Sequence, residues 1–317
     1  MSVRFWKQLL VALRRLSPGS IEREANRPFS LAVVGSPAEV EEWTERLNPA
    51  SQSPRKREQG LRWLFPISLP LSESYARMLP RYDLVLAAPS ASRSVRALVR
   101  DYIPLPAEND EKNGRWAAAV MHEVEERKPD LRLTLARHYW PLRVAAVEQI
   151  IAGVARENAA FSIASALPNV VPTALLPAWA AGEFLSDTVF ITGNQFRMAF
   201  LIAAASDSAV GWTAQKAQLG SIFGSAFGWR AIARELSGKL PGGAGLVAKG
   251  LIAYAGTYAV GYGLDFLHRF GRHLTRAEKR QAYQQAYRNG RQAVEEVARK
   301  LTGRSGTGRA PTRATWT

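Results

Sequence analysis

Residues 178–207 read AWAAGEFLSDTVFITGNQFRMAFLIAAASD, an apolar stretch that carries four polar residues at helical spacing. At about 100° per residue, Glu183, Asp187, Asn194 and Arg197 fall within a sector of roughly 80° on one helix face. Polar groups on an otherwise apolar helix are costly to bury unless they find partners. We therefore expect this structural polar stripe to face a neighbouring helix, either in a bundle or in a membrane.

Everything after residue 115 has a helical pattern. We expect helices over residues 115–128, 142–166, 178–207, 213–236, 244–270 and 276–301. Two of them carry small residues at four-residue intervals, where helix backbones can approach closely despite the weak helix propensity of glycine. These predicted helix-packing positions are Gly220, Gly224, Gly228, Ala255, Ala259 and Gly263.

The segment before residue 115 alternates short apolar runs with helical patterns. Strands are predicted at residues 29–35, 61–67 and 82–88, with helices at 37–47 and 91–100. The expected fold is α+β overall. It comprises a small α/β domain, degenerate G-domain-like or Rossmann-like, followed by an all-α, Ala/Gly-rich helical domain.

The predicted segments are a basic amphipathic helix (1–27), the α/β domain (28–114), the helical domain (115–275), and an amphipathic helix with a basic disordered tail (276–317). The net charge of +15 is concentrated at the ends. Residues 1–30 hold six basic and two acidic residues, and residues 268–317 hold twelve and three, which leaves +2 for the middle. Basic ends beside apolar helices favour anionic membrane lipid as a partner over nucleic acid.

Residues 3–16, VRFWKQLLVALRRL, predict a helix with one apolar and one basic face. Such a helix is typical of a peripheral membrane anchor. The side chains expected to contact the membrane are Trp6, Leu9, Leu13, Arg14 and Arg15. The alternative is a purely structural helix that packs on the protein's own core.

The best candidate for a transmembrane helix is residues 244–264, because a bilayer core requires about 20 residues and the one charge, Lys249, can reach an interface. From this we expect a protein at the cytoplasmic face of a bacterial membrane, with at least one helical hairpin inserted into it or lying against it.

Nucleotide-binding motifs are absent from the α/β segment. Gly35 is followed by Ser36 and Pro37 without the GK[ST] of a P-loop, and Glu39 would repel phosphate. Nucleotide hydrolysis is therefore not expected.

Residues for other chemistry are also absent. The histidines His122, His138, His268 and His273 have no metal-ligand spacing, and the sequence has no cysteine and no GxSxG motif. We predict no catalytic residue, no cofactor and no metal site, and hence no enzyme.

From Leu135 to about Gly271 the chain resembles a bacterial helical domain of uncharacterised role, the YcjF-type domain-of-unknown-function family 697. The matching segments are LARHYWPLR, RENAAFSIASALPNVVP, Asp187 with the GNQFRM that follows, and GWRAIARELSGKLPGGAGLVAKGLIAYAGTYAVG. The resemblance implies a membrane-associated helical domain of the kind found behind a small GTPase domain. It implies no catalytic residue.

These observations predict a non-catalytic, membrane-associated interaction or scaffold protein, with a protein partner or a second copy bound through the helical domain. One alternative is a regulatory GTPase-related protein that binds nucleotide through a non-standard loop. A second is a basic nucleic-acid-binding protein.

Overall fold

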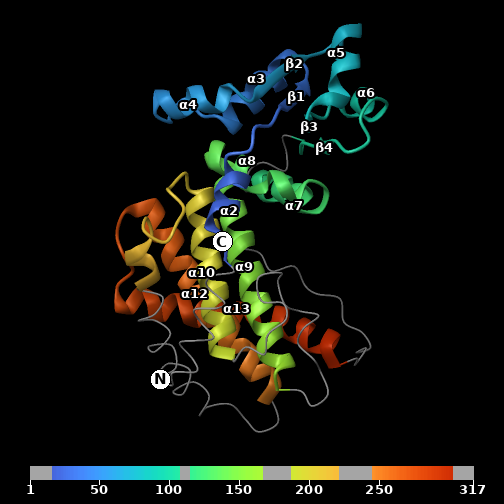
Figure 1. Cartoon of the computed structure of the whole chain (residues 1–317). Helices are drawn as coiled ribbons and strands as arrows, with labels where there is room; N and C mark the ends of the chain where they lie inside the picture. The colour runs from blue at the N-terminus through green and yellow to red at the C-terminus, as the bar shows by residue number, and fades with distance from the viewer. Residues whose placement is uncertain (1–15, 108–114, 167–186, 221–244, 303–317) are drawn as a thin grey trace.

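The computed structural model describes residues 16–107, 115–166, 187–220 and 245–302 (Figure 1). Within them, one small parallel sheet lies above a group of long helices. This content agrees with the predicted α+β class. The predicted membrane contacts Trp6, Leu9, Leu13, Arg14 and Arg15 lie outside the described residues, as do Glu183, Gly224, Gly228, the tail and the side chain of Asp187.

The sheet has the strand order β2-β1-β3-β4, and every pair is parallel. Leu31 of the central strand lies opposite Leu64 on one side and Leu84 on the other. All residues of β1 are buried, which explains why this strand reads as a continuous apolar run. The strands are β1 (Leu31–Gly35), β2 (Leu64–Ser68), β3 (Leu84–Ala87) and β4 (Ile103–Pro104).

Alternate side chains of the strands enter two separate apolar layers. Leu31, Val33 and Leu86 belong to a large core that continues into the helices below, whereas Ala32 and Val34 pack in a smaller cluster with Leu79 and Val95. The surrounding elements are α2 (Pro18–Ala25), α3 (Pro37–Leu47), α4 (Pro54–Leu61), α5 (Glu73–Met78), the 3₁₀ turn η1 (Leu79–Arg81) and α6 (Ser92–Arg96).

Helix α4 occupies a stretch that reads as a polar loop in the sequence. Its contacts with its neighbours are polar: Asn48 donates from Nδ2 to the Arg57 carbonyl at 2.9 Å, and Arg57 pairs with Glu45 at 3.1 Å. Gly60 also packs against the Asn48 side chain, where an added Cβ would lie 2.8 Å from Oδ1. A helix held in this way has no hydrophobic periodicity to reveal it.

Four long helices, α9, α10, α12 and α13, lie side by side below the sheet (Figure 1). Pro129 follows the end of α7, and Pro141 stands in the first turn of α9, the two positions where proline is tolerated. The elements are α7 (Trp116–Arg127), the 3₁₀ turn η3 (Pro129–Leu131), α8 (Arg132–His138), α9 (Trp140–Ala164), α10 (Asp187–Ala205), α12 (Gly245–Phe270) and α13 (Arg276–Thr302).

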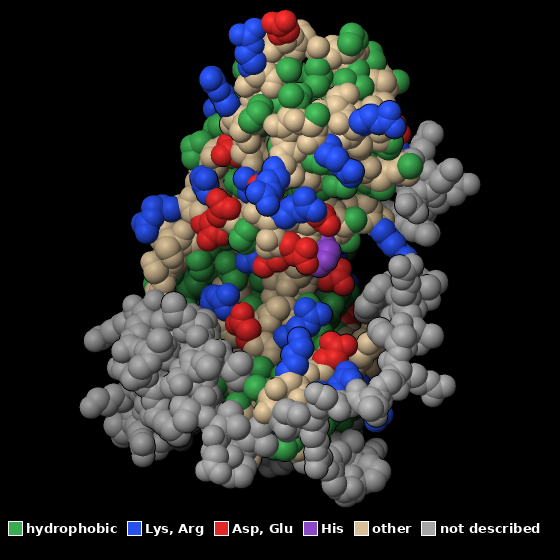
Figure 2. All heavy atoms as spheres, turned by 90° about the vertical axis from the view of Figure 1, so that its right-hand side faces the viewer, with side chains coloured by type: hydrophobic (Ala, Val, Ile, Leu, Met, Phe, Trp, Pro, Cys, Tyr) green, Lys and Arg blue, Asp and Glu red, His purple; other side chains and the backbone are tan. Residues whose placement is uncertain are grey.

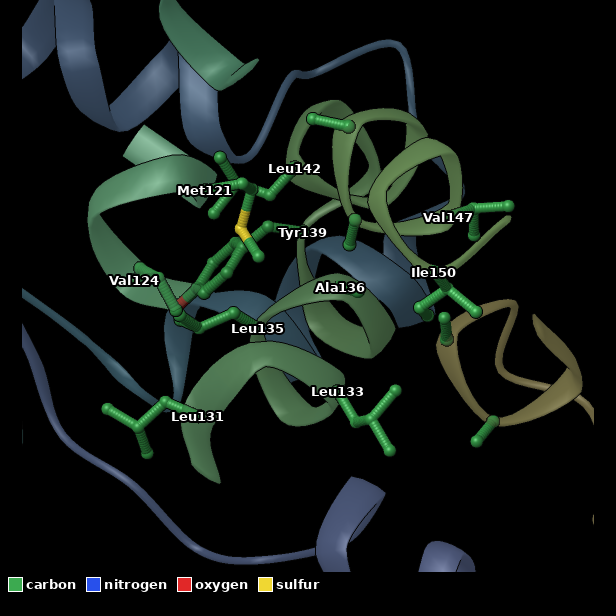
Figure 3. Packing of buried hydrophobic residues seen from close by; sticks show 14 of the residues in the cluster. Met121, Val124, Leu131, Leu133, Leu135, Ala136, Tyr139, Leu142, Val147 and Ile150 are labelled. Carbon is green, nitrogen blue, oxygen red and sulfur yellow. The ribbon is translucent and has the colours of Figure 1, made fainter. Parts of the chain in front are cut away.

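Tyr139 lies in the core that joins the sheet to the helices. Its ring packs among Met121, Leu135 and Leu142 (Figure 3), and its hydroxyl donates to the Gly60 carbonyl at 3.2 Å. Burial raises the pKa of Tyr139 far above its ordinary value. The hydroxyl therefore stays protonated and links the helical part to the last turn of α4.

The predicted transmembrane helix is wrong on the evidence of the described helices. Over residues 16–107, 115–166, 187–220 and 245–302, no helix combines the length and apolar content that a bilayer crossing needs. Helix α12, the expected transmembrane candidate, is interrupted by tyrosines, glycines, Lys249 and Asp265. Its apolar residues pack instead against α9 and α13. The predicted transmembrane helix and the predicted location at the cytoplasmic membrane are both corrected by this finding.

Candidate functional site

Asn194 and Arg197 of the polar stripe meet partners on α9. Arg197 Nη1 lies 2.8 Å from Glu157 Oε2 and 3.0 Å from Asn194 Oδ1. Asn194 Nδ2 donates to Glu157 Oε2 at 2.9 Å and to Asn158 Oδ1 at 3.0 Å. Asn158 in turn donates to the Thr257 hydroxyl of α12 at 2.7 Å. This network links three helices through groups that satisfy one another, so its role is structural.

The predicted helix-packing residues occupy different environments. Ala255 and Ala259 are buried against α13, in one cluster with Tyr283. An added Cβ at Gly263 would meet Leu274 at an ordinary 3.5 Å, and one at Gly220 would meet nothing within 4 Å.

Two close approaches of α12 to α9 involve glycines that the sequence pattern did not single out. A Cβ at Gly250 would lie 2.7 Å from Ile163, and one at Gly261 would lie 2.7 Å from Ile151. With the buried Thr257 they form the α9-facing side of α12, at intervals of seven and four residues. Helix α12 thus carries small residues on two faces, one toward α9 and one toward α13. The sequence pattern predicted the face toward α13.

The turn after β1 lies where a nucleotide phosphate would bind in an α/β fold, at the carboxyl ends of β1 and β3. The Glu39 carboxylate occupies this place. Oε2 accepts from the Ser36 amide at 2.8 Å and from the Ser36 hydroxyl at 2.7 Å. The Ser90 amide donates to Oε1 at 3.3 Å, and the Ser90 hydroxyl donates to Oε2.

Four donors from two loops therefore converge on one internal carboxylate. Burial raises the pKa of Glu39, but the hydrogen bonds from Ser90 and Ser36 outweigh this effect, and the net pKa lies below the ordinary value. Gly35 closes the turn further, since a Cβ there would lie 2.8 Å from the Ala88 Cβ. The carboxylate takes the amide and hydroxyl donors that a phosphate would need.

The histidines that the structure describes have separate surroundings. The ring of His138 lies 5.7 Å from that of Phe29. His268 Nδ1 lies 3.3 Å from the Ser208 hydroxyl, and His122 lies 3.5 Å from Glu126. Among the described residues, no three His, Asp or Glu side chains come together as metal ligands.

A groove with a volume of about 680 Å³ runs between α9, α12 and α13, and we call it the α9–α12–α13 groove. Its floor is a stripe of aromatic residues one helical turn apart on α12: Tyr254, Tyr258, Tyr262 and Phe266. Polar residues line its α13 wall, namely Gln281, Gln285, Asn289, Gln292 and Glu296. The α9 wall carries Glu148, Ala152 and Arg156.

The aromatic floor changes from buried to open along the groove. Tyr254 is 7% exposed and stacks on Tyr258 with ring centroids 6.0 Å apart, whereas Tyr262 is 37% exposed. Burial, with the nearby Glu148 carboxylate as the next contribution, raises the pKa of Tyr258 well above its ordinary value. The Tyr258 hydroxyl is thus a neutral group that can donate a hydrogen bond.

Five polar side chains along this groove have no hydrogen bond or ion pair with any residue that the structure describes: Glu148, Arg156, Gln281, Gln285 and Asn289. They belong to two helices that face each other across the aromatic floor. Solvated surface side chains are often unpaired, but here they border one concave aromatic surface. Such a combination is typical of binding sites.

Comparisons of the chain with family models, with curated proteins and with solved structures gave no match. The resemblance to the YcjF-type family therefore stays a prediction. The groove itself was not predicted from the sequence. Two signals for it are nonetheless present: the four-residue spacing of aromatic residues from Tyr254 to Phe266, and that of amides from Gln281 to Asn289.

Proposed function

We propose that this protein is a non-catalytic interaction protein whose α9–α12–α13 groove binds a segment of a partner protein. The observation that carries the proposal is the row of unpaired polar side chains around an aromatic floor. Tyrosine is enriched among the residues that dominate binding energy at interfaces. The amides of Gln281, Gln285 and Asn289 offer both donors and acceptors to a polypeptide.

The dimensions of the groove support a peptide as the occupant. Its α13 wall extends from Glu278 to Glu296, a separation of 18 residues (296 − 278), or about 27 Å at 1.5 Å per residue. This length matches about five turns of a docked helix or about eight residues of an extended strand. Docking of an amphipathic helix into an aromatic groove is a common mode of recognition.

In this proposal the α/β unit is a degenerate G-domain-like or Rossmann-like fold that supports the helices without binding nucleotide. The Glu39 carboxylate favours this reading over a GTPase-related protein with a non-standard loop, because it holds the donors of the β1–α3 turn.

Nucleic-acid binding has less support than peptide binding. On the face shown in Figure 2, Asp and Glu side chains are interspersed among Lys and Arg around the middle of the molecule. A nucleic-acid-binding surface is expected to carry a basic patch or stripe.

The decisive experiment compares two neighbouring glutamines on α13. Gln285 lines the groove, and Gln284 is also exposed but does not line it. A photo-crosslinking amino acid is placed at either position in the full chain, and crosslinked products from its native cells are identified by mass spectrometry. We expect a discrete protein partner at position 285, little product at 284, and loss of the 285 product when Ala152→Trp fills the groove. Equal products at both positions, or a product that persists in the filled variant, would overturn the proposal.

A further inference from the structure

At Phe266, the C-terminal end of the aromatic stripe on α12, the ring is already covered by a cation of the protein itself. The Arg272 guanidinium lies over the Phe266 ring, with its central carbon 4.6 Å from the ring centroid. The same guanidinium makes two hydrogen bonds to Glu278, with Nη2 to Oε1 at 2.9 Å and Nη1 to Oε2 at 3.1 Å. An aromatic face beside a carboxylate is thus a unit that binds guanidinium in this molecule.

The same unit recurs further along the groove without an occupant from the described residues. Tyr262 precedes Phe266 by one helical turn, its ring centroid 6.4 Å from that of Phe266, and Tyr258 precedes it by two. Glu148 lines the same groove from α9, lies close enough to Tyr258 to raise its pKa, and has no hydrogen bond or ion pair with the rest of the described chain. Aromatic faces and an available carboxylate therefore line the same stretch of the groove.

We propose that Glu148, Tyr258 and Tyr262 together accept the guanidinium group of an arginine side chain from the partner protein. This assignment rests on the proposed function and names the chemistry that the partner must present. Arginine suits the site because its planar group stacks on aromatic rings while it bonds a carboxylate through paired donors. Lysine, a compact and strongly hydrated charge, would satisfy the carboxylate but gain less from the rings.

The charges around the site are consistent with this occupant. Two other carboxylates line the groove: Glu278 is engaged by Arg272, and Glu296, at the opposite end of the α13 wall, accepts from Gln292. Glu148 is therefore the available carboxylate next to Tyr258. Arg156 lies eight residues along α9 from Glu148, or about 12 Å along the helix axis. The net charge of +15 disfavours general attraction of a cation. Binding of a cationic peptide therefore requires a local acidic site.

The test measures binding of a fluorescently labelled oligo-arginine peptide to the full chain by anisotropy at low salt. Glu148→Gln is compared with Glu41→Gln, which removes the same charge from an exposed position on α3. We expect the first substitution to weaken binding about fivefold, the upper range for a partly exposed ion pair, and the second to leave it nearly unchanged. Equal weakening by both would reduce the effect to net charge and overturn the proposal, as would absence of binding to the unaltered chain.

A second pair of variants tests the aromatic contribution at the half-open Tyr262. Tyr262→Leu keeps an apolar side chain but removes the ring, and Tyr262→Phe keeps the ring. We expect about threefold weaker binding of oligo-arginine for the leucine variant and an unchanged affinity for the phenylalanine variant. Equal affinity of the two variants for oligo-arginine would show that the Tyr262 ring does not contribute to binding, and it would overturn the assignment.

The two proposals fail in different ways. If position 285 crosslinks a partner while Glu148→Gln and Glu41→Gln bind oligo-arginine alike, the groove binds another chemistry and the arginine assignment alone is overturned. If positions 284 and 285 crosslink alike, the proposed function is overturned whatever the peptide does.

Discussion

The carboxyl edge of the sheet and the α9–α12–α13 groove are both rich in polar side chains, but they differ in whether those side chains have partners. At the sheet edge, Glu39 collects four hydrogen bonds from Ser36 and Ser90. In the groove, Glu148 and Gln285 have none from the described residues. A polar cluster that satisfies itself contributes to stability, whereas one left open around aromatic rings is available to a ligand.

Helix α9 shows the same contrast within three consecutive residues. Glu157 and Asn158 belong to the buried network with α10 and α12, while Arg156 faces the groove. The comparison therefore predicts large effects on stability on one side of α9 and small effects on the other. The following predictions test this, from the largest expected change to the smallest.

Asn158→Ala should lower the free energy of unfolding by about 2–3 kcal/mol, because it removes a fully buried amide that donates to the Thr257 hydroxyl and accepts one of the two hydrogen bonds from Asn194 Nδ2. Arg156→Ala, two residues earlier on the open side, should change it by less than about 0.5 kcal/mol. Urea denaturation of both variants makes the comparison. Similar losses of unfolding free energy for the two variants would show that the groove side of α9 also contributes to stability, and would contradict the comparison.

Gly261→Ala should destabilise the protein by about 2 kcal/mol, because the new Cβ would lie 2.7 Å from Ile151 and 2.9 Å from the sulfur of Met198. Gly153→Ala on α9 adds a methyl group where no atom lies within 4 Å, and it should stabilise the helix by up to about 1 kcal/mol. Thermal unfolding reports both changes. A stable Gly261→Ala variant would mean that α9 and α12 are less closely packed than described.

Glu39→Gln should cost about 1 kcal/mol at neutral pH, in the range of a lost helix cap. The pKa of Glu39 is lower in the folded protein than its ordinary value, so its contribution is present above the ordinary pKa. That contribution is lost as the pH falls through the lowered pKa. Unfolding curves measured at a series of pH values should therefore converge for the two proteins in acid. A difference that grows on acidification would contradict the role given to this carboxylate.

Part of the secondary structure could be predicted from the sequence. Helix α3 has the predicted bounds Pro37–Leu47, since a Ser36 cap, Pro37 at the first position and an apolar period all agree. Helices α12 and α13 also follow their predicted ranges closely. Helices α4 and α5 were not predicted, because both are short and neither carries a regular apolar face.

The site required information that local pattern does not hold. The apolar runs of α9, α10 and α12 fit a membrane and a tight bundle equally well, and only the packing of the helices against one another separates the two. The groove arises from three helices distant in sequence, so its aromatic stripe and amide row have no meaning until their relative placement is known. Glu39 was expected to repel phosphate from the turn. In the structure, the Glu39 carboxylate accepts hydrogen bonds from Ser36 in the turn and from Ser90 on another loop. The local sequence around Glu39 does not reveal the position of Ser90.

The most direct test of the contrast between the closed sheet edge and the open groove is a single pair of unfolding free energies. Glu39→Ala and Glu148→Ala each remove one carboxylate, from the sheet edge and from the groove respectively. In the absence of any partner, we predict that Glu39→Ala lowers the free energy of unfolding by about 1–2 kcal/mol and that Glu148→Ala changes it by less than about 0.5 kcal/mol. Equal losses, or a larger loss for Glu148→Ala, would show that the groove carboxylate is part of the structural framework and would contradict the account.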